Sequence, residues 1–134
     1  MTDPDDVGVP RFNGRTAVEL ASDAEDAVLG IVHLAEAHDV PLDVETVYRT
    51  LSGLTRVVEQ LPEAVTRLRA VAIRQHEVEA FDVTTGAFAG NPAAALGALH
   101  DAVDAMLESF GAVRTGLDNA QASLAGVETP TRAT

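Results

Sequence analysis

The sequence of 134 residues contains no cysteine, no lysine and no tryptophan, and its aromatic residues are four phenylalanines and one tyrosine. The absence of cysteine excludes disulfides, thiol nucleophiles and cysteine-ligated zinc sites. Hydrophobic residues nevertheless make up 46% of the chain, so the core must be built mainly from small aliphatic side chains. Such a composition favours close-packed helices over a β-sandwich, and the length suits one domain.

Long apolar runs are also missing, since none approaches the roughly 20 residues that a membrane-spanning helix needs. The amino-terminal stretch MTDPDDVGVP carries acids where a secretory signal would carry bases. We therefore expect residues 1–15 to be a disordered acidic leader and the protein to be cytoplasmic.

Charge is strongly biased, with 21 acidic residues, 9 basic residues and a formal net charge of −12. No segment gathers enough arginine to neutralise phosphate groups. Direct binding to nucleic acid or to a membrane surface is therefore not expected.

The residues TAVE at the start of the first apolar repeat are typical of a capping box. The hydroxyl of Thr16 can accept a hydrogen bond from the amide of Glu19, whose carboxylate reaches back to the amide of Thr16. Apolar residues then recur at steps of three and four as far as His38, and the turn-forming stretch DVPLD follows. This pattern predicts a first helix over residues 16–38.

A second helix is predicted over residues 44–81, with Asp43 as its cap. Its seven-residue apolar repeat continues through Pro62, although a proline removes one backbone hydrogen bond and crowds the preceding turn. We expect one helix that is kinked near Pro62; in the alternative, a helix ends at Gln60 and a new one begins with Pro62 in its first turn. We call the residues of this repeat the predicted seam, because they should face the neighbouring helix: Val44, Val47, Leu51, Leu54, Val58, Leu61, Val65, Leu68 and Ala72.

A third helix is predicted over residues 92–127, with Asn91 as its cap, Pro92 in its first turn and Gly126 at its end. A row of small residues, seven apart, lies beside its seam and would allow another helix to approach closely: Ala95, Ala102, Ser109, Gly116 and Ser123. The predicted seam consists of Leu96, Leu99, Val103, Met106, Phe110, Val113, Leu117, Ala120, Leu124 and Val127.

Three helices joined by short links predict an all-α fold, an elongated, coiled-coil-like antiparallel three-helix bundle over residues 16–127, followed by a disordered tail over 128–134. At 1.5 Å per residue, the first helix would be about 35 Å long and the other two about 50–55 Å. The first helix is therefore too short to cover the far end of the hairpin that the other two form.

Apolar residues at that far end outnumber the internal seam positions available to them. We hypothesise that they contact a second copy of the chain or a partner protein. In the alternative, the chain folds back there, and these residues pack on one another or on the leader through Phe12. The predicted interface residues are Val71, Ile73, Val78, Phe81, Phe88 and Leu99.

The sequence offers no convincing catalytic or metal-binding constellation. In HLAEAHD, His33 and Glu36 share a helix face, but His38 does not join them at ligand spacing. His76 and His100 each lie near acidic residues, as is common on exposed helix faces, and neither a nucleophile nor a glycine-rich phosphate loop accompanies them. We therefore expect no enzymatic activity, no metal and no cofactor.

The residues FAG at 88–90 lie in the loop between the two long predicted helices. Two long helices around a short aromatic-x-Gly turn resemble the WXG helical-hairpin proteins, which work as dimers and as substrates of a specialised secretion system. The likeness covers residues 44–127, with Phe88 where that family has Trp, an additional amino-terminal helix, and no Tyr-x-x-x-acid signal after the last helix. It implies a helical hairpin, self-association and secretion.

These observations favour a non-enzymatic helical protein that acts by helix-to-helix association, either with itself as a homo-oligomer or with a protein partner. The alternative is an acidic inhibitor, antitoxin-like in its action, that masks a basic partner through Asp23, Glu25 and Asp26 of the first helix. Salt separates the two, because apolar association should survive about 0.5 M salt, whereas charge masking should weaken as the screening length falls to a few Å.

Overall fold

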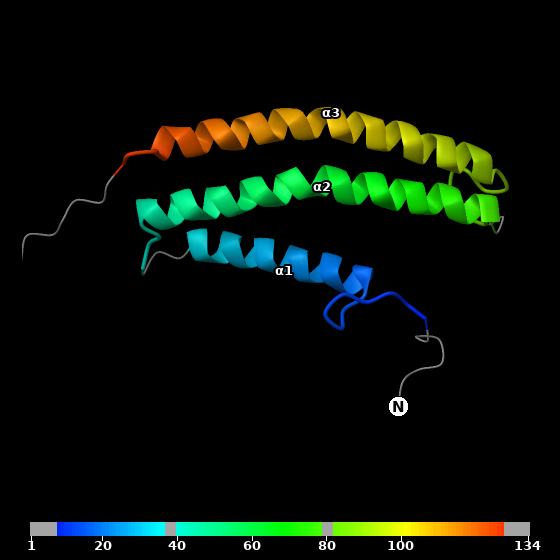
Figure 1. Cartoon of the computed structure of the whole chain (residues 1–134), viewed down its shortest axis with the longest axis horizontal. Coiled ribbons are helices and arrows are strands. Elements are labelled where there is room, and N and C mark those ends of the chain that lie inside the picture. The colour runs from blue at the N-terminus through cyan, green and yellow to red at the C-terminus, as the bar shows by residue number, and fades with distance from the viewer. Residues whose placement is uncertain (1–7, 37–39, 79–81, 128–134) are drawn as a thin grey trace, which may run out of the picture. The chain divides into compact units, whose positions relative to one another are not determined.

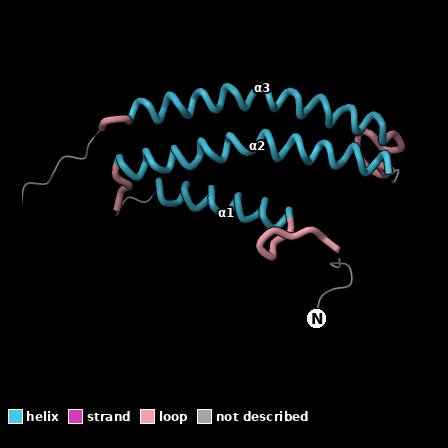
Figure 2. Tube along the Cα trace, in the orientation of Figure 1, coloured by secondary structure: helices cyan, strands magenta, loops and turns pink. Residues whose placement is uncertain are grey.

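A computed structural model describes residues 8–36, 40–78 and 82–127. This part of the chain contains the helices α1 (Ala17–Glu36), α2 (Val44–Val78) and α3 (Pro92–Leu124), and no strand (Figure 2). The prediction of an all-α protein is therefore confirmed. The chain divides into two compact units, Met1–Asp43 with α1 and Val44–Thr134 with α2 and α3, and each is described by itself.

The capping box predicted for α1 is confirmed. The amide of Thr16 donates to Oε1 of Glu19 at 3.0 Å, and the amide of Glu19 donates to Oγ1 of Thr16 at 3.2 Å. A turn closed by two backbone hydrogen bonds between Phe12 and Arg15 precedes the helix. From that turn Arg15 reaches forward, and its guanidinium binds both carboxylate oxygens of Asp23 at 2.6 and 3.0 Å.

Helix α2 is continuous and contains Pro62, as predicted. Residues 79–81, the last turn of the predicted helix, lie outside the described residues. Helix α3 begins as predicted, since Oδ1 of Asn91 accepts from the amide of Ala94 at 3.1 Å and Pro92 occupies the first turn. It ends at Leu124, three residues before the predicted end, because the backbone enters the left-handed region at Gly126 with φ of 79°.

Helices α2 and α3 lie side by side and run in opposite directions, so that they form a hairpin (Figure 1). Two ion pairs between the helices define its register. Arg69 binds Oδ1 of Asp104 at 2.6 Å, and Arg114 binds Oε1 of Glu59 at 3.1 Å.

Between the two helices runs a seam whose positions alternate at steps of three and four. Its best buried residues are Val103, 1% exposed, and Thr55, 7% exposed, whose hydroxyl donates to the carbonyl of Leu51 at 2.9 Å. Two α3 seam positions are more exposed, and they carry polar contacts across the seam: Arg114 pairs with Glu59, and the carbonyl of His100 accepts from Arg69 at 3.4 Å. The other seam residues are at least partly buried, namely Tyr48, Leu51, Val58, Pro62, Val65, Arg69, Ala72 and His76 of α2 and Leu96, Leu107, Phe110, Leu117, Gln121 and Leu124 of α3.

About half of the predicted seam positions do not lie in the observed seam, and this part of the prediction is wrong. On α2, Leu61 and Leu68 were expected inside, but they are 40% and 61% exposed. On α3, Leu99, Met106 and Val113 are 36%, 41% and 49% exposed. The physical reason is that each helix carries two adjacent apolar series, and only one of them can face the neighbouring helix.

Candidate functional site

The second apolar series of each helix lies one residue before the seam positions. Successive residues in an α-helix are about 100° apart around the axis. Because α2 and α3 are antiparallel, a backward rotation of 100° from the seam turns both series to the same side of the hairpin. We call this side the apolar face; its positions are Val47, Thr50, Leu54, Val57, Leu61, Ala64, Leu68, Val71 and Gln75 of α2 and Ala95, Leu99, Ala102, Met106, Ser109, Val113, Gly116, Ala120 and Ser123 of α3.

None of these positions carries a charge, although the chain holds 30 charged residues in total, 21 acidic and 9 basic. The exposed large side chains of the face retain between 36% and 61% of their surface in contact with solvent: Val57, Leu61, Leu68, Val71, Leu99, Met106 and Val113. A shallow groove of about 460 Å³ along α2 is lined by Val57, Leu61 and Ala64 of the face, together with Gly53, Arg56 and Gln60 outside it. An exposed apolar patch is a candidate interaction surface, because monomeric proteins rarely expose large contiguous ones.

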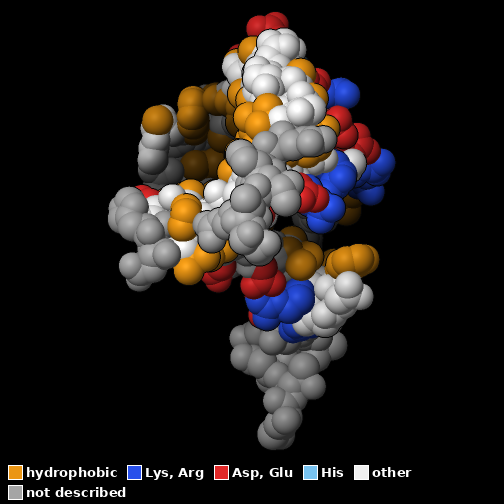
Figure 3. Space-filling view, turned by 90° about the vertical axis from the view of Figure 1, so that its left-hand side faces the viewer, with side chains coloured by type: hydrophobic (Ala, Val, Ile, Leu, Met, Phe, Trp, Pro, Cys, Tyr) orange, Lys and Arg blue, Asp and Glu red, His pale blue; other side chains and the backbone are white. Residues whose placement is uncertain are grey.

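The opposite side of the hairpin, one residue after the seam positions, is polar. In Figure 3, which looks along the hairpin from its open end, arginine, aspartate and glutamate side chains gather on the right-hand side. The charged residues on this side are Arg49, Arg56, Glu59, Glu63 and Glu77 of α2 and Asp101, Asp104, Glu108 and Asp118 of α3. The hairpin is thus amphipathic, since one of its two sides is apolar and the opposite side is polar.

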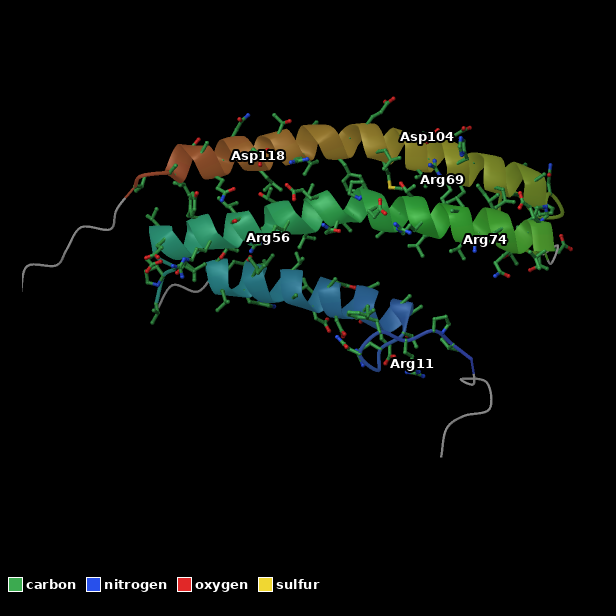
Figure 4. All side chains as sticks on the ribbon, viewed as in Figure 1. Arg11, Arg56, Arg69, Arg74, Asp104 and Asp118 are labelled. Atoms are coloured by element: carbon green, nitrogen blue, oxygen red, sulfur yellow. The ribbon has the colours of Figure 1, made fainter. Side chains whose placement is uncertain are left out.

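The ion pair between Arg69 and Asp104 joins α2 and α3 in the half of the hairpin nearest its loop. The side chain of Arg69 is only 15% exposed and points to Asp104 (Figure 4). The hydrogen bond from Arg69, together with the coulombic effect of His100, holds the pKa of the Asp104 carboxyl below the ordinary value of 3.8. Nε2 of His100 lies 3.3 Å from Oδ2 of Asp104. An arginine stem can cover apolar surface while its guanidinium reaches a polar partner. Arg69 therefore contributes its apolar stem to the seam while its charge stays paired with the carboxylate of Asp104.

The predicted interface residues do not all share one surface. Val71 and Leu99 lie on the apolar face, and Val78, 78% exposed, continues the α2 series by seven residues. Phe88 is 40% exposed in the loop before α3, whereas Ile73 is half-buried and lies on the polar side. Phe81 lies outside the described residues.

Sequence reasoning missed the greater part of the apolar face, because it assigned Leu61, Leu68, Met106 and Val113 to the internal seam. The uncharged positions seven residues apart on both helices were the signal that could have revealed a second apolar side.

Within the described part of the chain, no group of three or more His, Asp or Glu side chains is arranged to hold a metal ion. None of the three helices is long and apolar enough to span a bilayer. Asp23, one of the acids considered for masking a basic partner, is engaged by Arg15.

Comparison with protein-family models, with curated proteins and with solved structures finds no match to this chain.

Proposed function

We propose that this protein is non-enzymatic and works by helix-to-helix association with another protein chain, through the apolar face of the α2–α3 hairpin. The observation that carries the proposal is a two-helix surface free of charge, with large side chains about half exposed, on a chain of net charge −12. An acidic protein keeps such a surface free of carboxylates where it must lose its water on binding.

The free energy available on the face is sufficient for association. Burying a Val, Leu or Met side chain completely is worth about 1.5–3 kcal/mol, so covering the exposed half of seven such side chains contributes roughly 5–10 kcal/mol. A partner surface of the same kind would contribute a similar amount. Losing free translation and rotation on association costs on the order of 4–15 kcal/mol, which the two surfaces together can offset.

Masking of a basic partner by α1 is less well supported than apolar association. Asp23 already binds Arg15 through two hydrogen bonds, which leaves Glu25 and Asp26 as the remaining acids considered for that role. Apolar association should persist at about 0.5 M salt, where the screening length is only a few Å. A complex that dissociates at that salt concentration would favour charge masking instead.

Single cysteines test whether the face is open to a partner, because the chain has no cysteine of its own. Met106→Cys lies on the apolar face, and Glu108→Cys, two residues on, lies on the polar side and serves as the matched control. In folded protein diluted to ~1 µM, where association is disfavoured by mass action, we expect a maleimide to label both variants at comparable rates. Slow labelling of Met106→Cys alone at every dilution would mean that the chain covers this surface itself, and would refute the proposed function.

A further inference from the structure

We propose that the chain occupying the apolar face is a second copy of this protein, and that two hairpins pack face to face as a two-fold symmetric four-helix dimer. This inference rests on the proposed function and adds the identity of the partner.

The size of the face indicates the size of the occupant. From Leu99 to Ser123 the face is about 36 Å long at 1.5 Å per residue, and two helices of about 10 Å each make it about 20 Å wide. That is on the order of 700 Å² per copy, close to the ~800 Å² per partner of a standard stable interface. A single helix of twenty residues, the length of α1, presents about 30 by 10 Å, which is less than half of the face. Another hairpin of the same length matches it fully.

Charge also favours a second copy. A basic partner would be recognised by carboxylates, and the face has none. Two chains of net charge −12 repel each other, so they can approach closely only where the contact surface excludes their acids. The acids Asp101, Asp104 and Glu108 of α3 all lie on the polar side, away from the contact.

The pattern on α3 is complementary to itself. A two-fold axis that lies between the two faces, at right angles to the helices, places α3 over its copy in antiparallel orientation, and a symmetric interface must pair the same surface with itself. On the α3 side of the apolar face, large and small residues form two series, each with a seven-residue spacing. The large series is Leu99, Met106 and Val113, and the small series is Ala95, Ala102, Ser109, Gly116 and Ser123. With the axis near the middle of α3, Val113 of one copy lies opposite Ser109 of the other, and Met106 lies opposite Gly116. Gly116 has no atom within 4 Å of the position that a Cβ would occupy, so a large side chain from the second copy has room there.

The test is the mass of the full chain in solution, by light scattering between ~1 and ~100 µM. A monomer is 14.0 kDa, and the proposal requires twice that mass in the upper part of the range. Val113→Asp places a carboxylate in the proposed contact. Thr115→Asp is the matched control, because valine and threonine have the same shape and Thr115 lies on the polar side of the same helix.

We expect the dimer dissociation constant to rise at least about 100-fold in Val113→Asp, since the dimer contains the substitution twice and each unpaired buried charge costs tenfold or more. Thr115→Asp should remain dimeric, and circular dichroism should show equal helix content in both. A dimer that survives Val113→Asp, or one that both substitutions dissociate equally, would overturn the proposal.

A wild-type chain that stays monomeric at ~100 µM would also overturn it. Labelling of Met106→Cys then separates the two proposals. Fast labelling in that monomer leaves the face available to a different protein, so the proposed function stands. Slow labelling means that the chain, for example α1, covers the face, and both proposals fail.

Discussion

Replacement of Val103 by alanine tests the assignment of the seam most directly. Val103 is 1% exposed, whereas Val113, on the same helix, is 49% exposed. Val103→Ala removes two buried methyl groups, worth about 0.8 kcal/mol each, and leaves a cavity that adds to the loss. Alanine recovers about 0.5 kcal/mol through its better helix propensity. The expected net loss is therefore about 1.5–2.5 kcal/mol in the free energy of unfolding.

Val113→Ala is the control for this measurement. In dilute protein its half-exposed side chain loses about 0.8 kcal/mol on truncation, and the gain in helix propensity offsets most of that. With a slope near 1 kcal/mol/M, urea unfolding followed by circular dichroism should show a midpoint about 1.5–2.5 M lower for Val103→Ala and a nearly unchanged midpoint for Val113→Ala. Equal losses, or a larger loss for Val113→Ala in dilute protein, would show that the two sides of α3 have been assigned wrongly.

Three further predictions concern the ends of the helices and the ion pair across the seam. The amide of Thr16 and nearby arginines hold the pKa of Glu19 below its ordinary 4.5. The capping box therefore stabilises α1 above pH 4.5, and its contribution is lost as the pH falls through the lowered pKa. Carbon chemical shifts of the first turn of α1 should report fraying at that pH, and a first turn that is unchanged at about pH 2 would contradict the prediction. Arg69→Met should let the pKa of Asp104 rise back toward 3.8, as a titration of its carboxyl carbon would show, and an unmoved pKa would mean that the ion pair does not form in solution. Asn91→Ala removes the cap of α3 and should cost about 1 kcal/mol in thermal unfolding, whereas a loss below about 0.3 kcal/mol would argue against the cap.

The sequence predicted the helices well, because their signals are local. The capping box at Thr16, the Asn91 and Pro92 pair, and the stop at Gly126 each depend on residues within one or two turns. The continuity of α2 through Pro62 was predicted from the apolar repeat, which does not shift across the proline.

Which apolar series faces the neighbouring helix was not predictable from hydrophobicity. The α2 seam includes Thr55, Pro62 and Arg69, none of which counts as apolar in a periodicity argument, whereas the exposed series contains the leucines Leu61 and Leu68. Threonine can be buried because its hydroxyl bonds the carbonyl four residues back, and Arg69 because its partner lies on the other helix. Such compensation is a tertiary property, so a hydrophobic stripe read from one helix selects the wrong side.

Arg69 also determines which alignments of the hairpin are acceptable. The seven-residue repeat would allow α3 to slide along α2 by one heptad with little change in apolar contact. The positions seven residues before and after Asp104 are Gly97 and Gly111, so either slide would bring a glycine to the place of the carboxylate and leave the guanidinium without its partner. A single polar group in an apolar seam is known to select one register at some cost in stability. The hairpin therefore uses the Arg69–Asp104 pair, together with the Arg114–Glu59 pair, to choose among alignments that its hydrophobic residues cannot distinguish.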